Sequence, residues 1–212
     1  MTGIAETITA TGREAGKQRT RQRLLDAARH VFLKAGYQGA RLDDIVAEAG
    51  FTKGALYWHF PNKQALFLAL IADSIDANLR TLDGFLALGG ADPAALKAQI
   101  GEWLDGIDAR ETLPAFGVEL EIESRRDAKF RAVHQQMIAG HEAALTDFLE
   151  QYFKLVEEQP AMPVAVLASS LITIFKGFAL ARQNRSDHSV NSAASVRHLM
   201  GLPAAGPPPP PR

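Results

Sequence analysis

The chain has 212 residues, enough for one or two domains with a core, and its 47% hydrophobic and 22% charged residues are ordinary for a globular protein. A net charge of -1 excludes a uniformly basic nucleic-acid-binding protein, and the absence of cysteine excludes disulfides, thiol catalysis and cysteine-ligated zinc. The charge is uneven: residues 1–60 hold nine Lys/Arg and six Asp/Glu, a balance of +3, and the remainder has a balance of -4. A basic end on an acidic body predicts that one end meets polyanions.

The N-terminal region is predicted to be a disordered arm followed by a helix. Residues 1–16 lack hydrophobic periodicity, as in a disordered arm. From about residue 19 to 35, apolar side chains recur on one helical face, and Gly36 is expected to end that helix. Arg19, Arg21 and Arg23 cluster at its start, where cations oppose the helix dipole. They are therefore either phosphate contacts or a solvated face.

Two short helices follow, predicted over residues 42–49 and 52–60, with Gly50 between them and Pro61 after them. Asp43 and Asp44 lie in the first turn of the former, where carboxylates suit the helix dipole. Three short helices joined by glycine turns, with a basic start, predict a helix-turn-helix unit.

The segment GFTKGALYWHF, residues 50–60, concentrates the residues expected to bind DNA. Thr52 is placed to cap its helix, and Leu56 and Phe60, four residues apart, are expected to pack inward. Lysine, tyrosine and aromatic edges on the other face suit phosphates and thymine methyl groups. The alternative is that these aromatic side chains simply fill a core.

The rest of the chain also shows helical periodicity, so we predict an all-α fold. Helices are expected from residue 63 to about 86 and over 93–109, 112–125, 127–157 and 163–183. The stretch Val164–Ala181 is apolar enough for a membrane span, but a buried interface helix is favoured because Lys176 would lie in hydrocarbon. No secretory signal peptide is apparent, so a cytoplasmic protein is expected. The ending GPPPPPR predicts a disordered polyproline II tail.

Residues 20–67, TRQRLLDAARHVFLKAGYQGARLDDIVAEAGFTKGALYWHFPNKQALF, resemble the DNA-binding domain of the TetR/AcrR family of one-component repressors. Many members have Thr or Ser where this chain has Arg41, which cannot cap a helix by accepting amides but could reach phosphate. The resemblance implies DNA contacts by Arg21, Arg41, Thr52, Lys53, Gly54, Ala55, Tyr57, Trp58, His59 and Lys63.

The resemblance also implies four regions and a homodimer. The regions are a disordered arm (1–16), a helix-turn-helix DNA-binding domain (17–62), a ligand-binding and dimerisation domain (63–202) and a Pro-rich tail (203–212). The last two long helices would pair with their symmetry mates, and the apolar residues of the final one cover an arc too wide for a single buried face. The expected dimer residues are Leu149, Phe153, Leu167, Leu171, Ile174, Phe175 and Phe178.

An effector pocket is implied within residues 66–180, where the family's pocket lies. For any one candidate a plain core residue is the favoured interpretation, and Glu119 with Glu123 could form either a buried carboxylate or an exposed charged face. His134 and His141 lie on one helix face and could ligate metal with one of these carboxylates, although spacing alone supports this weakly. The candidates are Phe67, Phe85, Trp103, Phe116, Glu119, Glu123, His134, Met137 and His141.

The function expected from these features is a ligand-responsive repressor, a homodimer on an inverted-repeat DNA operator, released by an apolar or drug-like small molecule. Within the family, TKGALYWHF is most similar to repressors of multidrug efflux pumps, and a regulator of a metabolic operon is the close alternative. A second class is an all-helical small-molecule-binding protein or enzyme. No nucleophile elbow, P-loop or zinc-hydrolase pattern occurs, so neither catalysis nor a cofactor or metal is expected.

Overall fold

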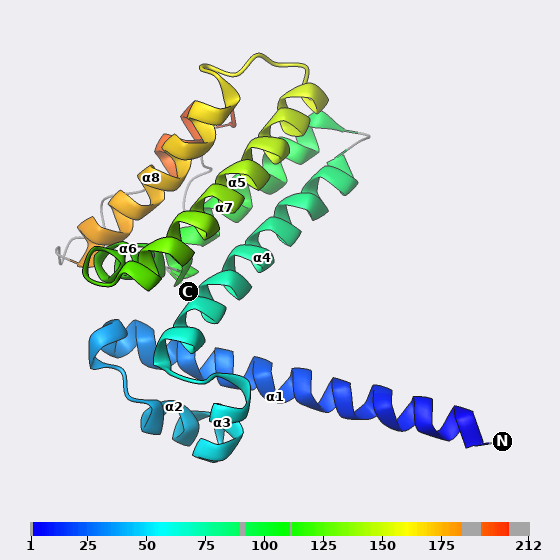
Figure 1. Cartoon of the computed structure of the whole chain (residues 1–212). Coiled ribbons are helices and arrows are strands. Elements are labelled where there is room, and N and C mark those ends of the chain that lie inside the picture. The colour runs from blue at the N-terminus through cyan, green and yellow to red at the C-terminus, as the bar shows by residue number, and fades with distance from the viewer. Residues whose placement is uncertain (1, 90–91, 111, 184–191, 204–212) are drawn as a thin grey trace, which may run out of the picture. The chain divides into compact units, whose positions relative to one another are not determined.

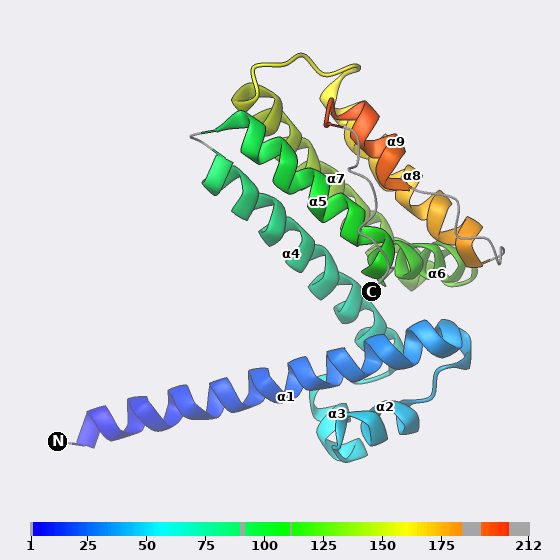
Figure 2. The same ribbon diagram turned by 180° about the vertical axis from the view of Figure 1, so that it is seen from behind.

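The computed structural model describes residues 2–89, 92–110, 112–183 and 192–203, and every regular element in that part of the chain is a helix (Figures 1 and 2). The all-α prediction is therefore confirmed, and the helix at residues 42–49 has the predicted bounds. In chain order the helices are α1 (Thr2–Gly39), α2 (Leu42–Ala49), α3 (Lys53–His59), α4 (Lys63–Gly89), α5 (Pro93–Arg110), α6 (Thr112–Arg126), α7 (Ala128–Leu155), α8 (Val164–Gln183) and α9 (Ser192–Leu199).

Helix α1 is longer than the sequence indicated, because it begins at Thr2 where a disordered arm was predicted. The arm lacks the apolar period that identifies a packed helix, but it also lacks proline, and it contains Ala and Glu, which favour helix. The expected stop at Gly36 appears as a kink. Gly36 leaves helical geometry at φ 67° and ψ 172°, and one further turn reaches Gly39.

Helix α9 was not predicted. It has eight residues, too few for a helix to be stable alone, and its stability comes from burial of Ala193 and Val196. Such tertiary stabilisation leaves no strong period in the sequence. Of the predicted proline-rich tail, only Pro203 belongs to the described residues, and 204–212 lie outside them.

The chain divides into two compact units, residues 1–72 and 73–212. In the first, α1, α2 and α3 surround an apolar core, and the first turns of α4 complete it. An aromatic trio lies there: the ring of Phe67 is 5.0 Å from that of Phe32 and 4.8 Å from that of Tyr37, centroid to centroid. Leu24, Ile45, Leu56 and Leu66 are fully buried beside it.

The second unit is built from the remainder of α4 and from α5 to α9. Helix α6 packs on both α7 and α8, and α9 packs on α5 and α8, as Figure 2 shows for α9. Arg197 fixes α9 through hydrogen bonds from Nε and Nη2 to the Asp105 carboxylate of α5 (3.1 and 2.6 Å) and from Nη1 to the Pro203 carbonyl (2.6 Å). Gly101 makes room, since a Cβ there would lie 2.5 Å from Arg197 Nη1.

Candidate nucleic-acid interface and ligand site

The turn between α2 and α3 is set by Gly50, which has φ 68° and ψ 35° in the left-handed region. Its N–H donates to the carbonyl of Ala47, and the N–H of Phe51 donates to that of Val46. Glycine adopts this conformation without steric cost, so the helix-turn-helix predicted from Gly50 has the expected geometry.

Arg23 holds this turn from α1. Its Nη2 donates to the carbonyl of Ala49 at 3.0 Å, the last residue of α2, and its guanidinium lies 4.7 Å from the ring centroid of Phe51. A cation at a helix C-terminus is favourable, and the stacked ring excludes water from it. Arg23, one of the three arginines considered for phosphate contact, is therefore a structural clamp. Its partners lie 26 and 28 residues away, which spacing rules do not reveal.

The N-terminus of α3 is capped as predicted, because the Thr52 hydroxyl accepts a hydrogen bond from the Ala55 N–H at 3.3 Å. Arg41, which begins α2, makes no side-chain cap, in line with its lack of an acceptor. Around Gly54 the space is open: an added Cβ would meet nothing nearer than the Thr52 hydroxyl at 3.8 Å. Glycine at 54 is thus not demanded by packing within the chain, but it would let another molecule approach closely.

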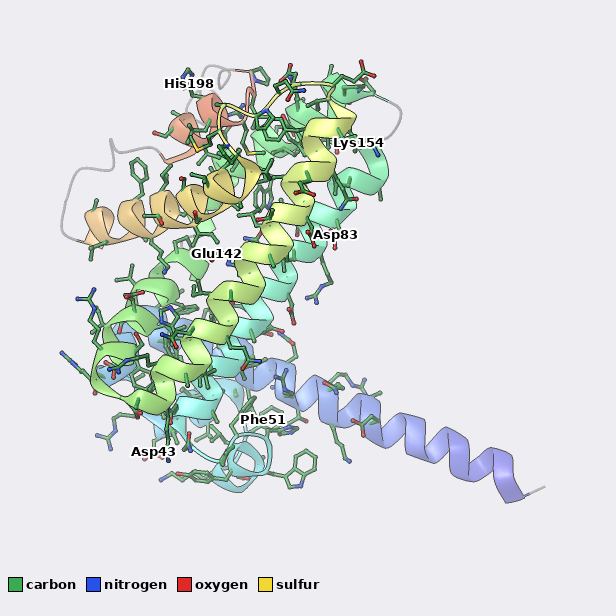
Figure 3. The ribbon with its side chains drawn as sticks, turned by 45° about the horizontal axis from the view of Figure 1, so that its top comes forward. Asp43, Phe51, Asp83, Glu142, Lys154 and His198 are labelled. Carbon is green, nitrogen blue, oxygen red and sulfur yellow. The ribbon has the colours of Figure 1, made fainter. Side chains whose placement is uncertain are left out.

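Lys53, the first residue of α3, forms an ion pair that the sequence did not reveal. Its Nζ lies 2.7 Å from Oδ1 of Asp43 on α2, and both side chains are about half exposed. The hydrogen bond and charge of Asp43 raise the pKa of Lys53 above its ordinary value, so the ammonium keeps its charge. Figure 3 labels Asp43 and, on the turn, Phe51.

Tyr57 and Trp58 are exposed by 51% and 63%, while Leu56 is fully buried and Phe60 nearly so. The split into an anchored face and an outward face therefore agrees with the predicted one. Trp58 contacts the edge of His59, and Lys17 Nζ lies 5.3 Å from a Trp58 ring centroid. Burial, then the charges of Arg21 and Lys17, lower the pKa of His59, so that it is neutral near pH 7.

Lys63 occupies a different environment from the predicted phosphate contact. Its Nζ donates to the carbonyls of Tyr37, Gln38 and Ala40 at 2.8, 3.1 and 3.1 Å, beneath the last turn of α1. Lysine has three N–H donors, and all three are used. In this structure Lys63 thus stabilises the α1–α2 connection, and a phosphate contact would require it to give up one of these bonds.

Comparison with known proteins identifies the family. Residues 24–70 match the family described as bacterial regulatory proteins, tetR family. The chain is 25% identical to the uncharacterised regulator YfiR of Bacillus subtilis over 76% of its length and 78% of the relative. It is 30% identical to the transposon Tn10 TetC protein of Escherichia coli, over 78% of this chain and 93% of that one.

The chain belongs to the TetR family. It is a transcriptional regulator with a DNA-binding helix-turn-helix. Among solved structures, Bacillus subtilis FadR in complex with stearoyl-CoA has the same fold, with a TM-score of 0.61 and 15% identity over 85% of this chain and 95% of FadR. These relatives are regulators rather than enzymes.

In this TetR-family chain, most candidate ligand residues lie in the second unit, with one exception. Phe67 is fully buried and contacts the rings of Phe32 and Tyr37 in the core of the first unit, because α4 begins inside that unit. Its role in the effector pocket stays a prediction. Phe85 and Trp103 meet edge to face in the second unit, at 6.0 Å between ring centroids.

The remaining candidates lie on α6 and α7. Phe116 is buried, Glu119 and Met137 are half-buried, and buried Glu123 has Oε1 3.6 Å from Arg126 Nη1. Burial and the charge of Lys176 lower the pKa of His141; burial and Lys176 also lower that of His134, against the opposing effect of Glu121. Within the described part of the chain, no three His, Asp or Glu side chains could hold a metal, so the metal alternative gains no geometric support.

Glu121 and Lys176 lie beside the predicted pocket residue His134, and neither was among the candidates predicted from the sequence. Oε2 of Glu121 on α6 lies 3.7 Å from Nε2 of His134 on α7 and 3.7 Å from Nζ of Lys176 on α8. Lys176 was read only as an argument against a membrane span. The signal in the sequence was that Lys176 is the one charged residue between Val164 and Ala181.

The predicted dimer residues separate into two groups. The first group, Leu149, Phe153, Leu167 and Leu171, is buried in the core of a single chain, and its role in a dimer stays a prediction. These apolar side chains pack within their own chain. Ile174, Phe175 and Phe178 are half-buried.

The face of α8 left open is a stripe of small and aliphatic residues, here called the outer stripe: Val166, Ser170, Thr173, Gly177 and Leu180. Val166, Thr173, Gly177 and Leu180 are exposed and Ser170 is half-buried. The hydroxyls of Ser170 and Thr173 donate to the α8 carbonyls of Val166 and Ser169 at 2.7 and 2.8 Å. With its hydroxyls already bonded, the stripe presents an essentially apolar surface.

Proposed function

We propose that the chain is a repressor that binds an inverted-repeat DNA operator as a homodimer and releases it when a small molecule binds the second unit. The observation that carries the proposal is the division of α3 into a buried anchor and an exposed set of aromatic and basic residues. Single exposed apolar residues are common, but adjacent exposed Tyr57 and Trp58 beside Lys17 and Lys53 fit a polyanion with stacked bases.

The proposed operator contacts follow from the exposure of side chains on α3 and at the start of α2. Lys53 and Arg41 are exposed cations for phosphate or guanine, Tyr57 and Trp58 reach backbone or thymine methyl groups, and Gly54 permits close approach. Thr52 and Ala55 hold the helix start, and Arg21, 5.6 Å from the Phe60 ring centroid, borders the same helix. In a two-fold dimer the two recognition helices would lie roughly 34–36 Å apart, about one turn of DNA.

A second copy of the chain is the proposed occupant of the outer stripe. Only 22% of the residues of Val164–Ala181 are buried in one chain, and by length and composition this helix could also cross a membrane. Lys176 argues for the dimer, because it forms an ion pair with Glu121 of α6 at the middle of the helix. Gly177 and the small Ser170 allow two helices to approach closely, so the stripe suits another helix.

We also propose a class of effector and a class of regulated gene. The second unit holds aromatic side chains and buried polar groups, and the FadR neighbour was solved with stearoyl-CoA. We expect an effector with an apolar body and control of an efflux pump, with a metabolic operon as the alternative. This activity on DNA would place the protein in the cytoplasm. A transporter gene divergent from this one would favour the efflux reading.

The test is an electrophoretic mobility shift with the DNA upstream of the protein's own gene. Tyr57→Ala is expected to weaken binding at least tenfold, while Leu33→Ala, an exposed apolar residue of α1 outside the proposed interface, leaves it unchanged. Absence of a shift at low salt, or equal binding by both variants, would contradict the operator proposal and favour the small-molecule-binding alternative.

A further inference from the structure

The cluster of Glu121, His134 and Lys176 joins three helices of the second unit through one carboxylate oxygen. Glu121 Oε2 is 3.7 Å from both the imidazole Nε2 of His134 and the ammonium of Lys176. Both separations exceed hydrogen-bond distance, and that to Lys176 is within the range of an ion pair. The pairing therefore holds charge close but leaves directional hydrogen bonding unused.

Two members of the cluster are fixed in place. The His134 side chain is only 9% exposed, and its Nε2 is buried with no hydrogen-bond partner. The Lys176 side chain is 25% exposed, and its stem lies across Gly117 of α6, where an added Cβ would be 3.4 Å from Lys176 Cε. Lys176 is also the sole charged residue between Val164 and Ala181. A partly buried ammonium on an otherwise uncharged stretch is stabilised by a nearby anion.

Glu121 is the member that can leave. Its side chain is 44% exposed, and its Oε1 lies 3.9 Å from Nη2 of Arg125, one turn along the same helix in a largely exposed position. Rotation of Glu121 toward Arg125 would keep its charge paired and hydrated. It would leave the partly buried Lys176 ammonium without an anion and the buried His134 Nε2 without an acceptor, which is unfavourable for both groups.

We infer that the effector of this regulator is an organic acid whose carboxylate or equivalent anionic group replaces Glu121 between Lys176 and His134. The anion would accept hydrogen bonds from the Lys176 ammonium and from the N–H tautomer of His134, and the apolar part of the molecule would lie among the neighbouring helices. That the acid acts as an effector rests on the proposed function, but the site itself is defined by the three side chains.

The exchange also explains how binding would act on α6. In the structure Glu121 of α6 contacts His134 of α7 and Lys176 of α8. With the anion in place Glu121 would pair within α6, and both contacts would be lost. A cationic ligand would meet the Lys176 charge, and a neutral one would leave Glu121 where it is. Neither would separate α6 from its partners by this route, because only an anion competes for the same cation.

The experiment compares three naphthalenes of one shape: 1-naphthoate, neutral 1-naphthamide and the cation 1-naphthylmethylammonium. Binding to the full-length protein is measured by titration calorimetry at pH 7. We expect the acid to bind at least tenfold more tightly than the amide and the ammonium to bind most weakly. Equal or tighter binding of the amide, or no binding of the acid, would overturn the inference.

Variants assign the preference to named residues. Lys176→Met should reduce the affinity for the acid to that for the amide, while Lys154→Met, which removes an exposed lysine at the far end of α7 (labelled in Figure 3), should change neither. Glu121→Gln should raise the affinity for naphthoate severalfold, because it removes the competing carboxylate. This gain cannot result from misfolding, so Glu121→Gln decides the question even if Lys176→Met is unstable.

Because these titrations contain no DNA, they fail separately from the operator proposal. A protein that binds its upstream DNA but shows no acid preference refutes only the anion site. A protein that binds naphthoate through Lys176 but shows no DNA shift refutes only the repressor.

Discussion

The two units expose different chemistry on their surfaces. The first presents aromatic rings and cations, Tyr57 and Trp58 beside Lys53 and Lys17, whereas the second presents the aliphatic and small residues of α8. Rings with polar tips near cations suit a charged and hydrated partner such as DNA, and a dry stripe with internally bonded hydroxyls suits another protein helix. The kind of exposed residue therefore distinguishes the proposed partners better than the amount of exposure does.

The cations of the two units differ as well. In the first, Arg23 and Lys63 bind backbone carbonyls and so fix the path of the chain around the helix-turn-helix. In the second, Arg197, Lys97 and Lys176 bind carboxylates on other elements, Asp105, Glu158 and Glu121. A carbonyl clamp sets local geometry permanently, while a carboxylate partner can be exchanged for another anion. Rigidity at the DNA end and exchangeable pairs at the ligand end fit a regulator.

The largest effect is expected on dimerisation, from a charged substitution in the outer stripe. Val166→Glu should place a carboxylate in the proposed α8–α8 contact and raise the dimer dissociation constant by at least about a hundredfold, as desolvating an unpaired charge costs several kcal/mol. Sedimentation velocity at micromolar concentration would then show monomers. Leu33→Glu, at an exposed apolar position of the first unit, is the matched control and should remain dimeric. A dimeric Val166→Glu protein would remove α8 from the interface.

The next comparison is between Lys63, which binds backbone carbonyls, and Lys53, which is exposed and paired with Asp43. Lys63→Met deletes three hydrogen bonds to carbonyls and should lower the free energy of unfolding by about 2 kcal/mol, the value typical of charged hydrogen bonds. Lys53→Met should leave the urea midpoint nearly unchanged, and should reduce the slope of log binding constant against log salt by about 0.9, one phosphate contact. If Lys63→Met lowers the slope and not the stability, Lys63 contacts DNA after all.

A smaller effect tests whether Asp43 competes with DNA for Lys53. Asp43→Asn frees the ammonium now held at 2.7 Å and should tighten operator binding by about threefold at low salt, in the range of surface ion pairs. Asp44→Asn makes the same charge change on the next, exposed residue of α2, and measures the general effect of removing a negative charge. Equal gains in the two variants would show that the Asp43–Lys53 pair has no specific role.

The sequence predicted what depends on local rules. Gly50, the Thr52 cap and the inward Leu56 and Phe60 follow from conformational preference and helical period, so the helix-turn-helix was placed correctly. The long-range contacts of the helix-turn-helix were not predicted, because no spacing rule links Arg23 to Ala49 or Lys63 to Tyr37. In the second unit, apolar helices alone did not show which face is internal, and Leu167 and Leu171, predicted as dimer residues, are buried in the core of a single chain.

The smallest expected effect is the pH dependence of the second unit. The pKa of His134 and that of His141 are lowered by burial and by the charge of Lys176, while Glu121 opposes the shift at His134. A depressed pKa means that the folded state binds the proton less tightly than the unfolded chain, where histidine has a pKa of about 6.5. The contribution of these histidines to the free energy of unfolding is thus complete above that value and declines as the pH falls from about 7 toward the folded pKa values.

Thermal melts of the wild type at pH 7.5 and 5.5 should show this decline, and His134→Gln should reduce it, since glutamine does not titrate. His30→Gln, an exposed histidine of α1, provides the control. A decline in His134→Gln as large as in the wild type would mean that the His134 imidazole does not titrate differently on folding.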